Sequence, residues 1–186
     1  MALTVNVDWG NEVIPAMLDT FDRYGVKVTF FLTGRWAKAY PELAAEIASR
    51  GHEIGNHGTD HAHPTRLSDA ELRDHIAANV EILRQAARTE PVPLYAPPYG
   101  EQDARVVRTA ASLGHFTTLW SLDTIDWQDP PPETIVRRVV PRAADGAIVL
   151  MHPKPQTLEA LSEILEGLEE KGYKVVPLWQ MILQAE

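Results

Sequence analysis

Short apolar runs alternate with helical patterns along the whole chain of 186 residues, and this alternation restricts the fold more than any other feature. The runs expected to form strands are 3–7, 28–32, 53–54, 94–95, 116–122, 147–152 and 174–176. The stretches expected to form helices are 14–24, 41–50, 69–88, one that ends at 113, and 157–171. Strands that alternate with helices pair in parallel and are covered by those helices. The sequence therefore predicts an α/β fold of about seven parallel strands, either an open sheet or a barrel. Because no linker or repeat interrupts the chain, one domain is expected over 1–186.

The composition limits the kinds of active site and binding partner that the chain can have. The chain has no cysteine, so a thiol nucleophile and a thiolate metal site are excluded, and a bound metal would need histidine and carboxylate ligands. The formal net charge of −9 disfavours nucleic acid or an anionic membrane as the main partner. No apolar run approaches the roughly 20 residues of a membrane span, and the first residues lack a signal-peptide pattern.

Polar side chains follow the expected strands at the points where the strands end. In parallel α/β folds the chemistry gathers at the carboxyl ends of the strands, so a shared site is expected there. The residues concerned are Asn6, Asp8, His57, His61, Tyr99, Asp126 and His152.

Two histidines and a carboxylate from this set have the composition of a metal site. His57 and His61 lie four residues apart in a glycine-containing loop, and with Asp8 they would form the two-histidine, one-carboxylate set that binds Zn²⁺ and similar ions. A plainer interpretation is that Asp8 caps the turn at Gly10 and that this stretch is merely rich in histidine. The same donor set also occurs in Fe(II) oxygenases, although the chain lacks an obvious arginine near the histidines to anchor a cosubstrate.

Three further segments are candidates. The turn Tyr95–Gly100, with two prolines and a glycine, could present a rigid backbone N–H to an oxyanion. The stretch Trp120–Trp127 carries two acids and two tryptophans and resembles a cleft wall, while Asp123 or Asp126 could instead be a helix cap. His152 ends an apolar strand and is either a core residue or a general acid at the mouth of a barrel.

These elements occur in the order and at about the spacing of the five motifs of the polysaccharide deacetylases, carbohydrate esterase family four. The runs 28–34, 51–57 and 146–153 are similar to signatures of that family. The resemblance covers nearly the whole chain. It implies a distorted (β/α) barrel with about seven parallel strands in a single domain.

The resemblance also implies roles for individual residues. Asp8, His57 and His61 would bind a divalent metal, zinc in the first place with cobalt or nickel compatible, while His152 would be the general acid and Asp126 its hydrogen-bonding partner. The substrate would meet Pro98 and the Tyr99 amide as oxyanion donor, Trp127 as one wall, and Leu150 beside the acetyl methyl.

Two positions depart from the family pattern. The aspartate that usually serves as catalytic base corresponds to Asn6, whose amide cannot accept a proton, and the arginine that usually pairs with it corresponds to Ala96. The two losses fit together, because an arginine without its carboxylate would be a partly buried, uncompensated charge. A second alignment makes Asp8 the base and puts Trp9 at the metal position; strand alternation disfavours it, since Trp9 would point away.

The sequence therefore predicts a metal-dependent hydrolase that removes N-acetyl or O-acetyl groups from a polysaccharide such as peptidoglycan or chitin-type oligomers. Another base, with Glu12 and Asp60 nearest, or a metal-bound hydroxide would then replace the missing aspartate. The main rival is a catalytically weak or inactive carbohydrate-binding member, which would have no need of contact between His152 and Asp126. The family is usually found outside the cytoplasm or in the cell envelope. The residues leave the particular substrate and the oligomeric state open.

Overall fold

The computed structural model describes residues 1–184, which contain seven strands and eight α-helices grouped in two compact units. One unit combines residues 1–29 with the part of the chain from Trp120 onward, and the other comprises residues 30–119. No helix in the described part is long and apolar enough to cross a membrane. The domain expected over 1–186 includes residues 185 and 186, which lie outside the described residues, and its extent stays a prediction.

The first unit is built around strand β7. Its elements are β1 (Ala2–Val7), α1 (Ile14–Arg23), β6 (Leu122–Asp123), α6 (Pro132–Val139), β7 (Ile148–Met151), α7 (Pro155–Glu170) and α8 (Leu178–Leu183). β7 pairs in parallel with β1, with Ala2 opposite Ile148, and with β6, with Leu122 opposite Val149. Helix α7 packs against α1 and α6. All six residues of β1 are buried, as expected for a parallel strand covered on both faces.

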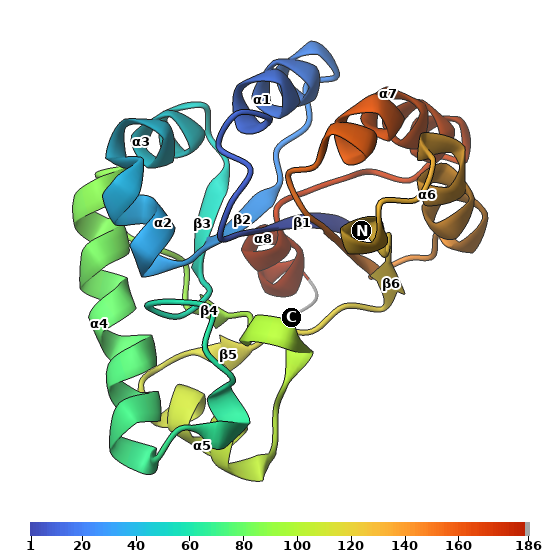
Figure 1. Ribbon diagram of the computed structural model, residues 1–186. Coiled ribbons are helices and arrows are strands. Elements are labelled where there is room, and N and C mark those ends of the chain that lie inside the picture. Colours follow the sequence, from blue (N-terminus) through green and yellow to red (C-terminus); the bar gives the residue numbers. More distant parts are fainter. Residues whose placement is uncertain (185–186) are drawn as a thin grey trace. The chain divides into compact units, whose positions relative to one another are not determined.

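The second unit has its own run of strands and helices. Its elements are β2 (Thr29–Leu32), α2 (Gly34–Ala39), α3 (Pro41–Ser49), β3 (Glu53–Asn56), α4 (Asp69–Ala87), β4 (Leu94–Tyr95), α5 (Ala104–Ser112) and β5 (Phe116–Thr117). β4 pairs in parallel with both β3 and β5. Helix α4, the long green helix of Figure 1, begins at a capping box of Ser68 and Glu71 and packs against α2, α3 and α5.

Two of the expected strands are wrong. The run 116–122 is not one strand, because the Thr118 N–H donates to the Tyr95 carbonyl beside β4, whereas the Ser121 N–H donates to the Ile148 carbonyl beside β7. The run is therefore divided into β5 and β6. The run 174–176 forms no strand, because its hydrogen bonds join Lys174 and Val176 to Met1 alone, which is too short a ladder.

The tightest backbone approach in the second unit lies at Gly58, and it predicts a specific stability loss. The φ angle of Gly58 is +81°, and a Cβ there would lie 1.9 Å from Nε2 of His75. Gly114 has a φ angle of +78° but nothing within 4 Å of a Cβ. Both alanine variants should lose about 1–2 kcal/mol to backbone strain, and Gly58→Ala should lose about 1–3 kcal/mol more from overpacking.

Urea unfolding of the two variants and the parent measures this difference in the free energy of unfolding. Gly114→Ala is the matched control for the loss caused by backbone strain alone. Equal losses in the two variants would show that His75 does not restrict the space at residue 58.

Candidate active site

The best-defined polar contact at a strand end joins His152 to Asp126. His152 follows β7, and Asp126 begins the 3-10 turn η3 (Asp126–Gln128) that follows β6, so the pairing of these two strands brings the residues together. His152 Nδ1 lies 2.7 Å from Asp126 Oδ1. The second carboxylate oxygen accepts hydrogen bonds from the His152 backbone N–H at 2.6 Å and from the Thr157 hydroxyl at 2.7 Å. The contact between His152 and Asp126, which a protein that only binds carbohydrate would not need, is therefore present.

The buried Asp126 carboxyl group stays ionised. Burial by itself would raise the pKa of Asp126, but the hydrogen bonds and charge of His152, together with the Thr157 hydroxyl, outweigh it and leave the pKa below its ordinary value. An ionised carboxylate accepts the Nδ1–H of the His152 ring. Nε2 is then the atom through which the imidazole can exchange a proton.

The turn that carries Asp126 is held in a strained backbone conformation. Ile125 and Asp129, on either side of η3, have φ angles of 51° and 53°, and a positive φ is costly for a β-branched residue such as isoleucine. Asp123 Oδ1 accepts a hydrogen bond from the Ile125 N–H at 2.7 Å. Of the two acids in this segment, Asp123 therefore caps the turn and Asp126 contacts the imidazole.

In the second unit, the backbone fixes the orientation of His57. Its ring follows β3, is buried, and has Nδ1 2.6 Å from the carbonyl oxygen of Ala96. Because a carbonyl only accepts, Nδ1 carries the proton and the lone pair of the neutral ring is on Nε2. The His61 ring lies edge-on to the His57 ring, with the centroids 5.2 Å apart. A hydrogen bond from the second ring nitrogen to a carbonyl is typical of metal-binding histidines.

Buried amides support the loop that carries these histidines. Asn56 Oδ1 accepts the Gly58 N–H at 2.8 Å and an Nδ2–H of Asn79, also at 2.8 Å. Asn79 donates in addition to the Leu32 carbonyl at 3.1 Å, which ties the loop to β2. The Asn56 side chain thereby satisfies the Gly58 N–H, whereas the Leu32 carbonyl also accepts the His57 N–H at 3.1 Å.

Asp60, one of the residues suggested as a replacement base, contacts a nearby backbone N–H and a buried histidine. Its Oδ1 accepts the Ala62 N–H at 3.1 Å and lies 3.5 Å from Nδ1 of the buried His75. Burial lowers the pKa of His75, and the nearby Asp60 charge partly opposes that effect. These contacts favour a structural role for Asp60 in the loop.

Tyr99 is held by an aromatic cluster that the sequence did not reveal. It lies in η2 (Pro98–Gly100) with a φ angle of 60°, and the His63 ring stacks on its ring at 4.1 Å between centroids. His61 meets the same ring edge-on at 4.3 Å, and His63 Nδ1 lies 2.9 Å from Glu101 Oε1. The turn is closed by the N–H groups of Gly100 and Glu101. The only signal was the histidine-rich sequence, which did not distinguish His63 from its neighbours.

The two positions that depart from the family pattern are both buried. Asn6 lies in β1, and Ala96 follows β4 and contributes the carbonyl that orients His57. β1 ends at Val7, so Asp8 lies just beyond the strand and the expected alternation does not extend to it. The expectation that Trp9 points away from the site is wrong, because its ring stacks on His152 with the centroids 5.9 Å apart. Strand alternation therefore does not exclude the second alignment, and the assignment of the base position to Asn6 stays a prediction.

The expected substrate-contacting residues differ in exposure. Leu150 is a buried residue of β7, and Pro98 is buried in η2. Trp127 in η3 has 54% of its surface exposed, which leaves a large apolar area in contact with water. An exposed tryptophan next to Asp126 offers an apolar face that a ligand can contact.

The donors assigned to the metal belong to both units. Asp8 lies in the first unit, and His57 and His61 lie in the second. Imidazole and carboxylate donors suit zinc, cobalt and nickel alike. Within residues 1–184 no cluster of three or more such side chains is identified as a preformed metal site. The assignment of these three ligands stays a prediction.

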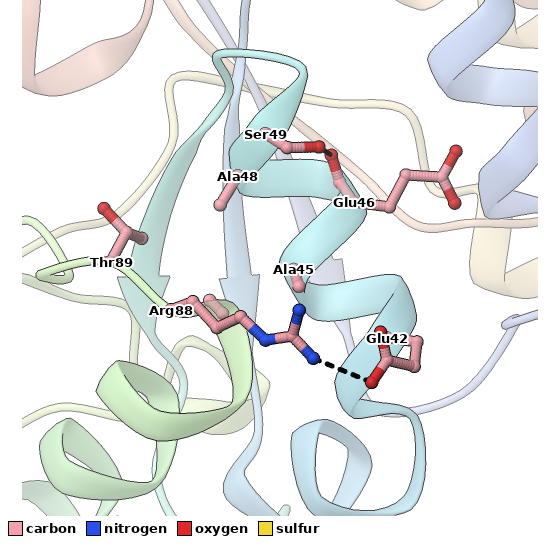
Figure 2. Close-up of a pocket in the computed structure, with 8 residues that line it drawn as sticks. Glu42, Ala45, Glu46, Ala48, Ser49, Arg88 and Thr89 are labelled. Atoms are coloured by element: carbon pink, nitrogen blue, oxygen red, sulfur yellow. Dashed lines mark hydrogen bonds and ion pairs between the residues drawn. The ribbon is translucent and has the colours of Figure 1, made fainter.

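A surface hollow in the second unit lies apart from these residues. It has a volume of about 480 Å³ and is lined by α3 and the residues that end α4. Figure 2 shows its one interresidue ion pair, in which Arg88 donates to Glu42 at 2.8 Å. Both partners are well exposed, and such pairs contribute little to stability. None of the lining residues is a candidate for the chemistry.

The chain belongs to the polysaccharide deacetylase family. The model of that family matches residues 1–117. The chain is 33% identical over 186 residues to the peptidoglycan-N-acetylglucosamine deacetylase of Bacillus cereus, and this match covers 97% of this chain and 67% of that protein. It is 37% identical over 173 residues to the uncharacterised protein YlxY of Bacillus subtilis, covering 93% of this chain. The chain spans about half, 54%, of the length of YlxY.

A solved structure of high similarity is that of BA3943, a family-four carbohydrate esterase pseudoenzyme of Bacillus anthracis. The TM-score is 0.93 at 39% identity, over 97% of this chain and 64% of that one. A mutant of BA3943 described as having restored enzymatic activity has the same TM-score at 37% identity. The expected fold class, an α/β fold of seven parallel strands of the family-four type, is confirmed.

The ionised Asp126 predicts how stability depends on pH. Because its folded pKa lies below the unfolded value of about 3.9, its stabilising contribution is complete above about pH 5 and is lost as the pH falls through the folded pKa. The free energy of unfolding should therefore fall more steeply for the parent than for Asp126→Asn between about pH 5 and pH 2. Urea unfolding at a series of pH values measures both slopes.

Asp145→Asn is the control, because it removes a carboxyl group of the same kind from an exposed position. It should follow the parent closely. If the free energies of unfolding of the parent and of Asp126→Asn differ by the same amount at every pH in this range, the assignment of a lowered pKa to Asp126 is contradicted.

Proposed function

We propose that this chain is the catalytic domain of a metal-dependent deacetylase that removes N-acetyl or O-acetyl groups from a polysaccharide. The observation that carries the proposal is the buried contact between His152 and the ionised Asp126. A protein that only binds carbohydrate needs no oriented proton donor. The names of the relatives, which include peptidoglycan-N-acetylglucosamine and chitooligosaccharide deacetylases, point to the same substrate class.

His152 is proposed as the general acid. Asp126 holds the ring by Nδ1, so Nε2 delivers the proton to the departing amine or alcohol. The Tyr99 N–H is proposed to donate to the oxyanion that forms at the acyl carbon. Leu150 and Trp127 are proposed to border the acetyl group, with Pro98 beside them. The stacked His63 ring and the turn hydrogen bonds would keep the Tyr99 amide in place.

The family's deacetylases depend on a metal, and Asp8, His57 and His61 are proposed to hold it here, with zinc as the first candidate and cobalt or nickel as alternatives. A bound divalent ion would polarise the acyl carbonyl and acidify a water molecule. The proposal is supported by the His57 tautomer, which puts the ring lone pair on Nε2.

A second candidate is a catalytically weak or inactive carbohydrate-binding member of the family. The replacement of the usual base by Asn6, together with Ala96 in place of arginine, favours it. The similarity to a pseudoenzyme favours it as well. A dedicated general base is typically worth about 10²–10⁴-fold in rate, so its loss would slow the reaction without removing the remaining chemistry.

Acetate release separates the two candidates. The parent should release acetate from at least one of N-acetylchitooligomers, peptidoglycan and acetylxylan when zinc, cobalt or nickel is returned to chelator-treated protein. His152→Ala should abolish that activity, because no other group is proposed to protonate the leaving group. Asn6→Asp with Ala96→Arg should raise the rate by about 10²–10⁴-fold, because the pair supplies a carboxylate base and its counter-charge.

His115→Ala is the control for the loss of a histidine, since His115 lies between α5 and β5 and its ring contacts the carbonyl oxygen of Leu113, two residues before it. It should match the parent. A His152→Ala variant as active as the parent would refute the mechanism. A parent that binds the glycans but releases acetate only after the double substitution would support the second candidate.

Direct zinc binding tests the ligand assignment independently of turnover. Isothermal titration of the chelator-treated chain should show one zinc site, and Asp8→Ala, His57→Ala and His61→Ala should each weaken it by at least about 100-fold, because each removes one of three protein ligands. His115→Ala should leave the affinity unchanged. Retention of the parent's affinity by Asp8→Ala would exclude a site shared by these three residues.

A further inference from the structure

Trp9 lies directly beside the proposed general acid, in the loop that follows β1. Its ring is nearly parallel to the His152 ring, with an angle of 17° between the planes and 5.9 Å between the centroids. The side chain is 41% exposed, so it is not a core residue. An indole that keeps this much apolar area in water next to a reactive imidazole is suited to contact a ligand.

The position of Trp9 is imposed by a close backbone approach. Gly10 has a φ angle of +81°, and a Cβ at this residue would lie 2.3 Å from the Pro153 carbonyl oxygen and 2.6 Å from Pro153 Cγ. Only a residue without a side chain lets the loop after β1 rest against the loop after β7 in this way. The approach brings Trp9 alongside His152.

A charged side chain then limits the movement of the indole. The Lys154 ammonium lies 5.5 Å from the centroid of the Trp9 ring and is paired with Asp129 next to η3. The Lys154 backbone N–H also donates to the His152 carbonyl at 2.8 Å. The cation–π contact and the ion pair together tie Trp9 to the same short loops that hold His152 and Asp126.

We propose that Trp9 is a substrate-contacting residue that stacks on the pyranose ring of the amino sugar whose nitrogen His152 protonates. The inference rests on the proposed function, because it takes the leaving group to be a glycan. The group that receives the proton must approach His152 Nε2, so the sugar that bears it comes close to the neighbouring indole. The C–H face of a pyranose is the part of the sugar that gains most from contact with an apolar ring.

Binding of tetra-N-acetylchitotetraose to the zinc-loaded protein tests the proposal. Trp9→Ala should raise the Kd, measured by isothermal titration, by about 10- to 100-fold, the size of one aromatic stacking contact. Trp9→Phe should stay within about fivefold of the parent, because a smaller aromatic face remains. Phe116→Ala is the control, since Phe116 is 59% exposed on β5 and has no proposed role.

Zinc affinity and acetate release are measured on the same samples. The zinc affinity of Trp9→Ala should equal that of the parent, because a role in binding the sugar does not involve the neighbouring Asp8. A loss of zinc affinity in Trp9→Ala, or an unchanged Kd for the oligosaccharide, would overturn the proposal, as would a failure of Trp9→Phe to restore binding. If the parent binds the oligosaccharide without releasing acetate, the proposed activity fails while the stacking role is still decided by the Kd values. If the parent binds no oligosaccharide, both are refuted for this glycan.

Discussion

The buried Asp126 carboxylate is the interaction on which the first unit's polar architecture depends. It accepts hydrogen bonds from the ring and backbone of His152 and from Thr157, and these contacts keep it ionised despite its burial. The strained backbone at Ile125 and the cap supplied by Asp123 place this carboxylate at the end of β7. A buried charge is tolerated only when it is satisfied in this way, so the local backbone is shaped around it.

The second unit orients its imidazoles by a different means. His57 is fixed by a backbone carbonyl, and its loop is held by the buried amides of Asn56 and Asn79. No charged partner is needed, because neutral hydrogen bonds suffice to select one tautomer. The contribution of Ala96 to this arrangement is made by its backbone, which explains how the family's arginine position can change without loss of the His57 contact.

The altered positions and the retained ones have different structural demands. The resemblance assigns Asn6 and Ala96, both buried, to the positions of a charge pair, and because each half of such a pair would be costly to bury alone, their joint loss is expected. Asp126 and His152 form a second pair that is intact. This carboxylate also has a structural role through the His152 N–H and the Thr157 hydroxyl, and its hydrogen bond to the His152 ring is the contact that a catalytic role would use.

The α/β class and the placement of the polar candidates at strand ends could be predicted from the sequence, because apolar periodicity is a local property of residue order and strands that alternate with helices pair in parallel. The sequence could not divide the run 116–122, assign the cap to Asp123 and the imidazole contact to Asp126, or bring Trp9 onto His152. Except for the cap at Asp123, which is local, these outcomes depend on distant partners, such as Ile148 for Ser121, His152 for Asp126 and Pro153 for Gly10. Only tertiary packing decides such contacts, since no short-range pattern encodes which distant backbone a loop will meet.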